Sequence, residues 1–190
     1  VVFLRPLGLR LETGLNPMKP REINTTALAY IGDAVYEIYV REHVLEASKT
    51  QAFGAHVDAL HKKAVRYVRA DGQAKALRRM LKEGFLTTEE EALVRRARNH
   101  KSASKPKNAD AMDYKYATAL EALIGYWYLT ARSLPDAGGA AIRVADTEKQ
   151  ENERITDAAD PQDVQLAPAD KAETRMEEIV FKAFSLIEKG

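Results

Sequence analysis

The sequence predicts an all-α fold, a helical bundle. Apolar residues recur at helical spacing along most of the 190 residues, and no stretch shows the strict alternation of a half-buried strand. Hydrophobic residues make up 45% of the chain, enough for one domain with a buried core. No apolar run approaches the roughly 20 residues that span a bilayer. The chain has no cysteine, which excludes disulfides and thiolate metal sites.

The first half of the chain predicts three helices, over residues 26–47, 54–69 and 73–83. In the first, Leu28, Ile31 and Val35 recur on one face. The second has an apolar stripe at the same period, and the third stops at Gly84, a usual C-terminal cap residue. The segment before them, residues 1–24, is expected to be irregular.

The second half predicts three more helices, over residues 88–98, 109–132 and 170–189. Thr88 and Glu91 have capping-box spacing, so the first of these is expected to open at Thr88. The second is the longest and most apolar. The third carries one apolar stripe that includes Met176, Ile179 and Val180, and we expect it to pack against the other helices.

The charges divide the chain into a basic body and an acidic insert. Residues 135–178 hold 12 acidic and 5 basic residues, whereas the remainder holds 16 acidic and 24 basic ones. Residues 135–168 contain glycines, prolines and many acids, and we interpret them as a disordered insert. The expected domain therefore comprises residues 25–134 and 169–190. A basic body of this kind favours a polyanionic partner, although surface charges can also cluster by chance.

Two acids stand in otherwise apolar helical segments. Asp33 follows Gly32 in the first helix, and Glu121 precedes Gly125 in the fifth. A carboxylate is costly to bury without a partner, and glycine inside a helix usually has a packing reason. We therefore predict that the two helices cross closely and that Asp33 and Glu121 converge on one divalent cation.

Other partners for these acids remain open at this stage. Asp33 could pair with an arginine or cap a helix, and Glu121 could pair with an arginine or histidine. Glu37 lies one turn after Asp33, and Arg41 lies four residues further on, so an ordinary surface ion pair is expected there. If a metal binds, oxygen ligands favour a hard cation such as Mg²⁺, with Mn²⁺ as a substitute, over zinc.

A basic run begins at the end of the fourth helix, continues through the loop after it, and contains no acid. Its six lysines and arginines, together with Asn and Ser donors, suit the phosphate backbone of an RNA duplex, while an ordinary solvated loop is the alternative. No aromatic residue interrupts the run, which argues against stacking on single-stranded bases. The candidate RNA-binding residues in it are Arg95, Arg96, Arg98, Asn99, Lys101, Lys105, Lys107 and Asn108.

These segments resemble known ones. Residues 28–37, with Gly32-Asp33-Ala34-Val35-Tyr36-Glu37, resemble the signature helix of the ribonuclease III family, and residues 121–125 resemble its second catalytic segment. Residues 95–99 and 106–108 are similar to a loop of the Mini-III ribonucleases, which lack a separate double-stranded-RNA-binding domain. Full-length members have two further acids, and Ala29 and Thr118 stand in their places, a reduction that Mini-III proteins share.

The resemblance implies an all-α endonuclease that works as a homodimer on double-stranded RNA. Asp33 and Glu121 would be the catalytic residues and the ligands of Mg²⁺, and Asp110 would contact RNA or support the loop. The ion would activate water for in-line attack, leaving a 5′-phosphate and a 3′-hydroxyl. The implied substrate is a structured ribosomal RNA precursor. We expect a cytoplasmic location, with an organelle stroma such as that of a plastid as the alternative.

Two other functions compete with this one. The first is a non-catalytic RNA-binding protein on a ribonuclease III scaffold, associated with ribosomes, and the loss of two acids at Ala29 and Thr118 suits it. The second is a helical interaction module without an RNA role, for which the basic run would be an accident.

Overall fold

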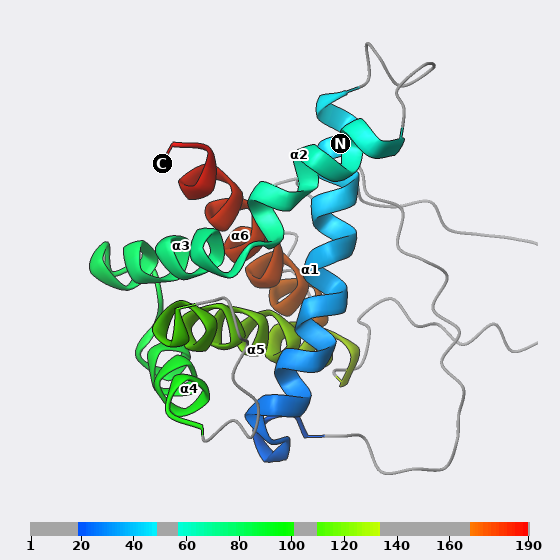
Figure 1. Cartoon of the computed structure of the whole chain (residues 1–190). Coiled ribbons are helices and arrows are strands. Elements are labelled where there is room, and N and C mark those ends of the chain that lie inside the picture. The colour runs from blue at the N-terminus through cyan, green and yellow to red at the C-terminus, as the bar shows by residue number, and fades with distance from the viewer. Residues whose placement is uncertain (1–18, 49–56, 101–109, 134–167, 190) are drawn as a thin grey trace, which may run out of the picture.

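The computed structural model describes residues 19–48, 57–100, 110–133 and 168–189. Within these ranges the chain forms a short 3-10 helix, η1 (Pro20–Glu22), and six α-helices, without a strand (Figure 1). The all-α prediction is therefore confirmed. The α-helices are α1 (Thr25–Ala47), α2 (Val57–Val68), α3 (Ala70–Lys82), α4 (Thr88–Arg98), α5 (Ala111–Ser133) and α6 (Pro168–Glu188).

Helix α5 lies at the centre of this bundle. It crosses α1, with which it makes the most extensive contact, and it also packs against α3, α4 and α6 (Figure 1). Leu120, Leu123 and Ile124 of α5 are completely buried, as are Leu28 and Tyr36 of α1. Burial of each such side chain contributes roughly 1.5–3 kcal/mol, so this crossing forms the centre of the hydrophobic core.

Local capping explains where several helices begin and end. Asn24 caps α1, because its side chain accepts a hydrogen bond from the backbone N–H of Ala27 at 2.8 Å. Gly84 follows α3 with a positive φ of 64°, which confirms the predicted stop. The predicted capping box was wrong by one residue, because Thr87, and not Thr88, caps α4 together with Glu90.

Other boundaries also differ from the predicted ones. Helix α3 begins at Ala70, three residues early, and runs through Gly72. Helix α6 begins at Pro168, whose fixed φ suits the first helical position. Residues 54–56, residue 109 and most of the acidic insert lie outside the described ranges, so the predicted division into domain and insert stays a prediction. In the described ranges no helix is long and apolar enough to span a membrane.

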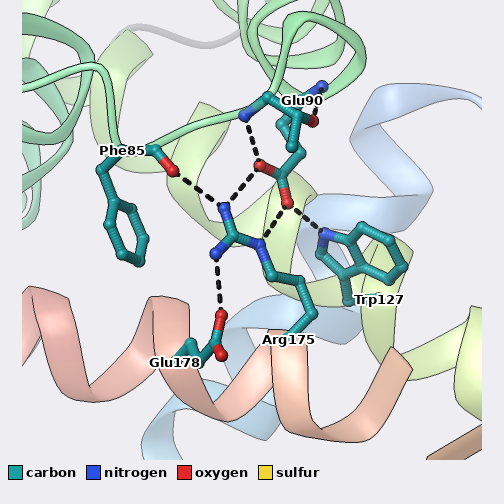
Figure 2. Close-up of polar contacts among 6 residues, drawn as sticks. Phe85, Glu90, Trp127, Arg175 and Glu178 are labelled. Atoms are coloured by element: carbon teal, nitrogen blue, oxygen red, sulfur yellow. Dashed lines mark hydrogen bonds and ion pairs between the residues drawn. The ribbon is translucent and has the colours of Figure 1, made fainter. Parts of the chain in front are cut away.

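A buried ion pair fixes α6 to α4 and α5 (Figure 2). Arg175 of α6 donates two hydrogen bonds to the carboxylate of Glu90, at 2.8 and 2.9 Å. Trp127 of α5 donates a third, at 2.9 Å, and Arg175 also reaches the backbone oxygen of Phe85. Burial by itself would raise the pKa of Glu90, but its bonds to Arg175, the Thr87 backbone and Trp127 outweigh that effect and lower the pKa. The prediction that the last helix packs against the others is confirmed.

Candidate metal centre

The two predicted acids lie where α1 and α5 cross. A Cβ atom added to Gly32 would lie 1.8 Å from the backbone oxygen of Glu121, and one added to Gly125 would lie 2.0 Å from the backbone oxygen of Leu28. The backbones therefore touch directly at both glycines, which confirms the predicted close crossing. Because Asp33 follows Gly32, the contact brings the Asp33 segment of α1 against the Glu121 segment of α5.

The pKa values of both carboxylates are raised. Burial first, and then the negative charge of Asp33, raise the pKa of Glu121 to about 7, against the opposing effect of a hydrogen bond from Gln73. The pKa of Asp33 is also raised, first by partial burial and then by the charge of Glu37. Both carboxylates are thus destabilised in their ionised forms, and a positive ion between them would relieve that cost.

The protein partners that the sequence left open for these acids are not found. In the part of the chain that the structure describes, neither Asp33 nor Glu121 forms an ion pair with an arginine, lysine or histidine. Glu37 behaves differently, because it pairs with Arg41 at 2.6 Å as expected. Asp33 and Glu121 therefore remain the two acids of this site that are available to a ligand from outside the protein.

The donor set fits a hard cation. No group of three or more histidines or acids that could hold a metal occurs among the described residues. Two carboxylates are, however, the protein ligands that Mg²⁺ commonly takes, with water and phosphate oxygens completing its shell. The residues present thus suit Mg²⁺ together with a phosphate-bearing substrate, and the assignment of Asp33 and Glu121 as metal ligands stays a prediction.

The sequence analysis missed a third polar residue at this site, Gln73. It belongs to α3, is only 1% exposed, and its side chain donates a hydrogen bond to the carboxylate of Glu121. Its side-chain oxygen is buried without a hydrogen-bond partner. The available signal was a glutamine among the apolar residues Ala74, Ala76 and Leu77 of an amphipathic helix.

The basic run begins on the last turn of α4. Arg95 and Arg96 are exposed there, but Arg98 is half-buried and donates a hydrogen bond to the Tyr116 hydroxyl at 3.0 Å. Asn99 caps the C-terminus of α4. Helix packing thus holds Arg98 in place, while Arg95 and Arg96 extend toward solvent. The remaining candidates lie outside the described residues: Lys101, Lys105, Lys107 and Asn108.

Asp110 has a structural contact of its own. Its carboxylate accepts hydrogen bonds from the backbone N–H groups of Met112 at 2.7 Å and Asp113 at 3.1 Å, at the start of α5. Helix α5 therefore begins at Ala111, two residues after the predicted start. Asp110 thus caps α5, while both of its predicted roles, support of the loop and contact with RNA, stay predictions.

A shallow hollow of about 600 Å³ lies between the start of α1 and the end of α4. Its lining includes Thr26 and Tyr30 of α1 and His100, which follows α4. Tyr30 is exposed and precedes Asp33 by three residues, so the two share a face of α1. The hollow therefore lies between the described end of the basic run and the face of α1 that carries Asp33.

Comparisons with known proteins agree with this arrangement. The protein-family model of the Ribonuclease III domain matches residues 26–132, a range that includes both Asp33 and Glu121. Mini-ribonuclease 3 of Enterococcus faecalis is 43% identical over 110 residues, which are 58% of this chain and 80% of that protein. That of Desulfitobacterium hafniense is 44% identical over 117 residues, 62% of this chain and 69% of that protein. A crystal structure of a Fusobacterium nucleatum protein matches with a TM-score of 0.52 and 31% identity, over 60% of this chain and 88% of the other.

Proposed function

We propose that this chain, which belongs to the ribonuclease III family of endoribonucleases, cleaves double-stranded RNA with Mg²⁺ bound by Asp33 and Glu121. One observation supports the proposal. Asp33 and Glu121 belong to two helices whose backbones touch at Gly32 and Gly125, the charge of Asp33 raises the pKa of Glu121, and neither acid forms an ion pair with a cation of the described chain. Such an arrangement costs stability in the free protein, and metal binding is the use that accounts for that cost.

The roles of the residues follow from their positions. Asp33 and Glu121 would hold the ion at the α1–α5 crossing, and Arg95 and Arg96 would bind backbone phosphates of the duplex. An ion held by Asp33 and Glu121 would supply activation of water for in-line attack on phosphorus and stabilisation of the charge on the leaving 3′ oxygen. The proposed products are a 5′-phosphate and a 3′-hydroxyl.

A duplex substrate agrees with the surface beside the acids. Arg95 and Arg96 are exposed on α4, and Tyr30 of α1 and His100 after α4 line one hollow. Duplex RNA is recognised chiefly through its phosphates and 2′-hydroxyls, which cationic and hydroxyl side chains can bind. A structured precursor of ribosomal RNA, in the cytoplasm or an organelle stroma, is the substrate and setting that we propose from the resemblance to Mini-III ribonucleases.

We further propose that the protein works as a homodimer, with one site for each strand. The outer face of α1 supports this, because Ile38 is 54% exposed and Leu45 is 50% exposed. Phe181 of α6, which is 43% exposed, packs its ring against that of Tyr39 of α1 at 6.1 Å. Exposed apolar side chains are typical of a protein interface where they form one patch.

A non-catalytic RNA-binding protein is the second candidate. It is favoured by the absence of an acid at Ala29, which is buried, and at Thr118, which is half-buried. A scaffold that had lost its activity would, however, have no reason to keep Asp33 and Glu121 close together at an energetic cost.

Cleavage of a long RNA duplex by purified protein, with and without Mg²⁺, tests the proposal. We expect Asp33→Asn to abolish Mg²⁺-dependent cleavage while duplex binding stays close to that of the wild type. The matched control is Glu37→Gln, which neutralises an acid on the same helix that is already paired with Arg41 and should retain most of the activity. If the wild type binds the duplex but cuts it with neither Mg²⁺ nor Mn²⁺, the non-catalytic scaffold is the better account.

A further inference from the structure

Gln73 occupies a position where a polar side chain is costly. It lies in α3, only 1% of its surface is exposed, and its buried neighbours in the helix are Ala74, Ala76 and Leu77. Burying an amide without full hydrogen bonding costs roughly 1–3 kcal/mol in proteins, and an apolar side chain of similar size would avoid that cost. The position therefore calls for a reason beyond packing.

The hydrogen bond from Gln73 to Glu121 supplies that reason. The amide N–H group donates to the Glu121 carboxylate, while the amide oxygen is buried without a partner. Reversing the amide would set its oxygen against a carboxylate oxygen, so an ionised Glu121 selects the orientation in which the N–H group faces it. The unpaired oxygen is thus the consequence of directing the N–H group at Glu121.

We propose that Gln73 is a positioning residue, whose amide holds the Glu121 carboxylate in the orientation that binds a divalent cation. A glutamate side chain has several rotatable bonds, and fixing one of its oxygens leaves the other directed for binding. The inference rests on the proposed function, because it concerns the same metal centre. Hydrogen-bonding partners of metal ligands commonly change metal affinity by 10–100-fold when they are replaced.

Replacement of Gln73 by methionine tests the inference, since methionine has a similar length but no amide. Binding of Mn²⁺ to the protein alone, without RNA, would be followed by the electron paramagnetic resonance signal of the free ion. We expect Gln73→Met to weaken Mn²⁺ binding about tenfold or more without lowering the unfolding temperature, because it also removes the unpaired oxygen. The control is Leu77→Met, one turn further along the same helix and fully buried, which should leave Mn²⁺ affinity unchanged.

The outcomes separate this inference from the proposed function. If Gln73→Met binds Mn²⁺ within twofold of the wild type while Asp33→Asn has lost binding, Gln73 has no positioning role and the metal centre stands. If the wild type neither binds Mn²⁺ nor cuts duplex RNA, both are wrong. Should Gln73→Met fail to fold, Gln73→Asn keeps the polarity, is too short by one methylene to reach Glu121, and should show the same weakened binding.

Discussion

Replacing Gly32 with alanine should force α1 and α5 apart at the candidate metal centre. The added Cβ atom would lie 1.8 Å from the backbone oxygen of Glu121 and 2.8 Å from the backbone nitrogen of Gly125, whereas ordinary contacts begin at 3.4 Å. The helices would have to separate by about 1.6 Å at this point. No flexible side chain can move to absorb the change, because the opposing atoms belong to the backbone.

Two opposing effects set the size of the loss. Alanine favours a helix over glycine by about 1 kcal/mol, whereas overpacking a core costs typically 1–3 kcal/mol and more where only backbone can move. We therefore expect Gly32→Ala to lower the free energy of unfolding by about 2 kcal/mol. Cleavage should fall further, by about 100-fold, because the displaced backbone oxygen belongs to Glu121 itself.

Urea denaturation followed by circular dichroism measures the loss of stability, and a duplex cleavage assay measures the loss of activity. The control is Gly84→Ala, where the added Cβ meets nothing within 4 Å and only the positive φ is strained. That variant should lose roughly 1–2 kcal/mol and keep its activity. If Gly32→Ala unfolds at the urea concentration of the wild type and cuts normally, the close crossing is not needed for the site.

Three further predictions concern other charged groups. Arg175→Met should lower the free energy of unfolding by roughly 3–5 kcal/mol, because Glu90 stays buried without its partner. In urea denaturation, adding Glu90→Gln to this variant should recover much of the lost stability. A loss below about 1 kcal/mol in Arg175→Met would contradict the prediction. Without metal, the raised pKa of Glu121 makes the wild type lose stability as pH rises from 4.5 to about 7. In EDTA, Glu121→Gln should therefore be roughly 3 kcal/mol more stable than the wild type at pH 8 and similar to it at pH 4. Equal stability of the two proteins at both pH values would exclude a raised pKa of Glu121. Changing Arg95 and Arg96 to glutamine should weaken duplex binding. The slope of the logarithm of the binding constant against the logarithm of salt concentration should fall by roughly one unit per lost phosphate contact. An unchanged slope would show that the two arginines do not contact the duplex.

The helices and their crossing could be predicted because the sequence records them locally. The apolar period shows which face of each helix is buried, and glycine within a helix marks a close approach. Gly32 and Gly125 stand beside acids in apolar segments, so both the crossing and the candidate ligands could be recognised without coordinates. The boundary errors are small, and the one at α4 arises because Thr87 and Thr88 can both cap the same helix.

The tertiary hydrogen bonds could not be predicted, because the partners lie far apart in the chain. Glu90 and Arg175 are separated by 85 positions, and nothing in either segment identifies the other. Gln73 reads as one polar residue of an amphipathic helix until α3 is packed against α5. Arg98 likewise looks like its exposed neighbours, although Tyr116 holds it against the body of the protein.

The convergence of Asp33 and Glu121 on one ion is the central claim. Crystals of the protein grown with Mn²⁺ and measured at a wavelength where manganese scatters anomalously would test it most directly. We predict an anomalous peak at the α1–α5 crossing, within bonding distance of a carboxylate oxygen from each residue. A peak elsewhere, or a structure at high Mn²⁺ concentration in which both carboxylates bind only protein groups or water, would contradict the claim.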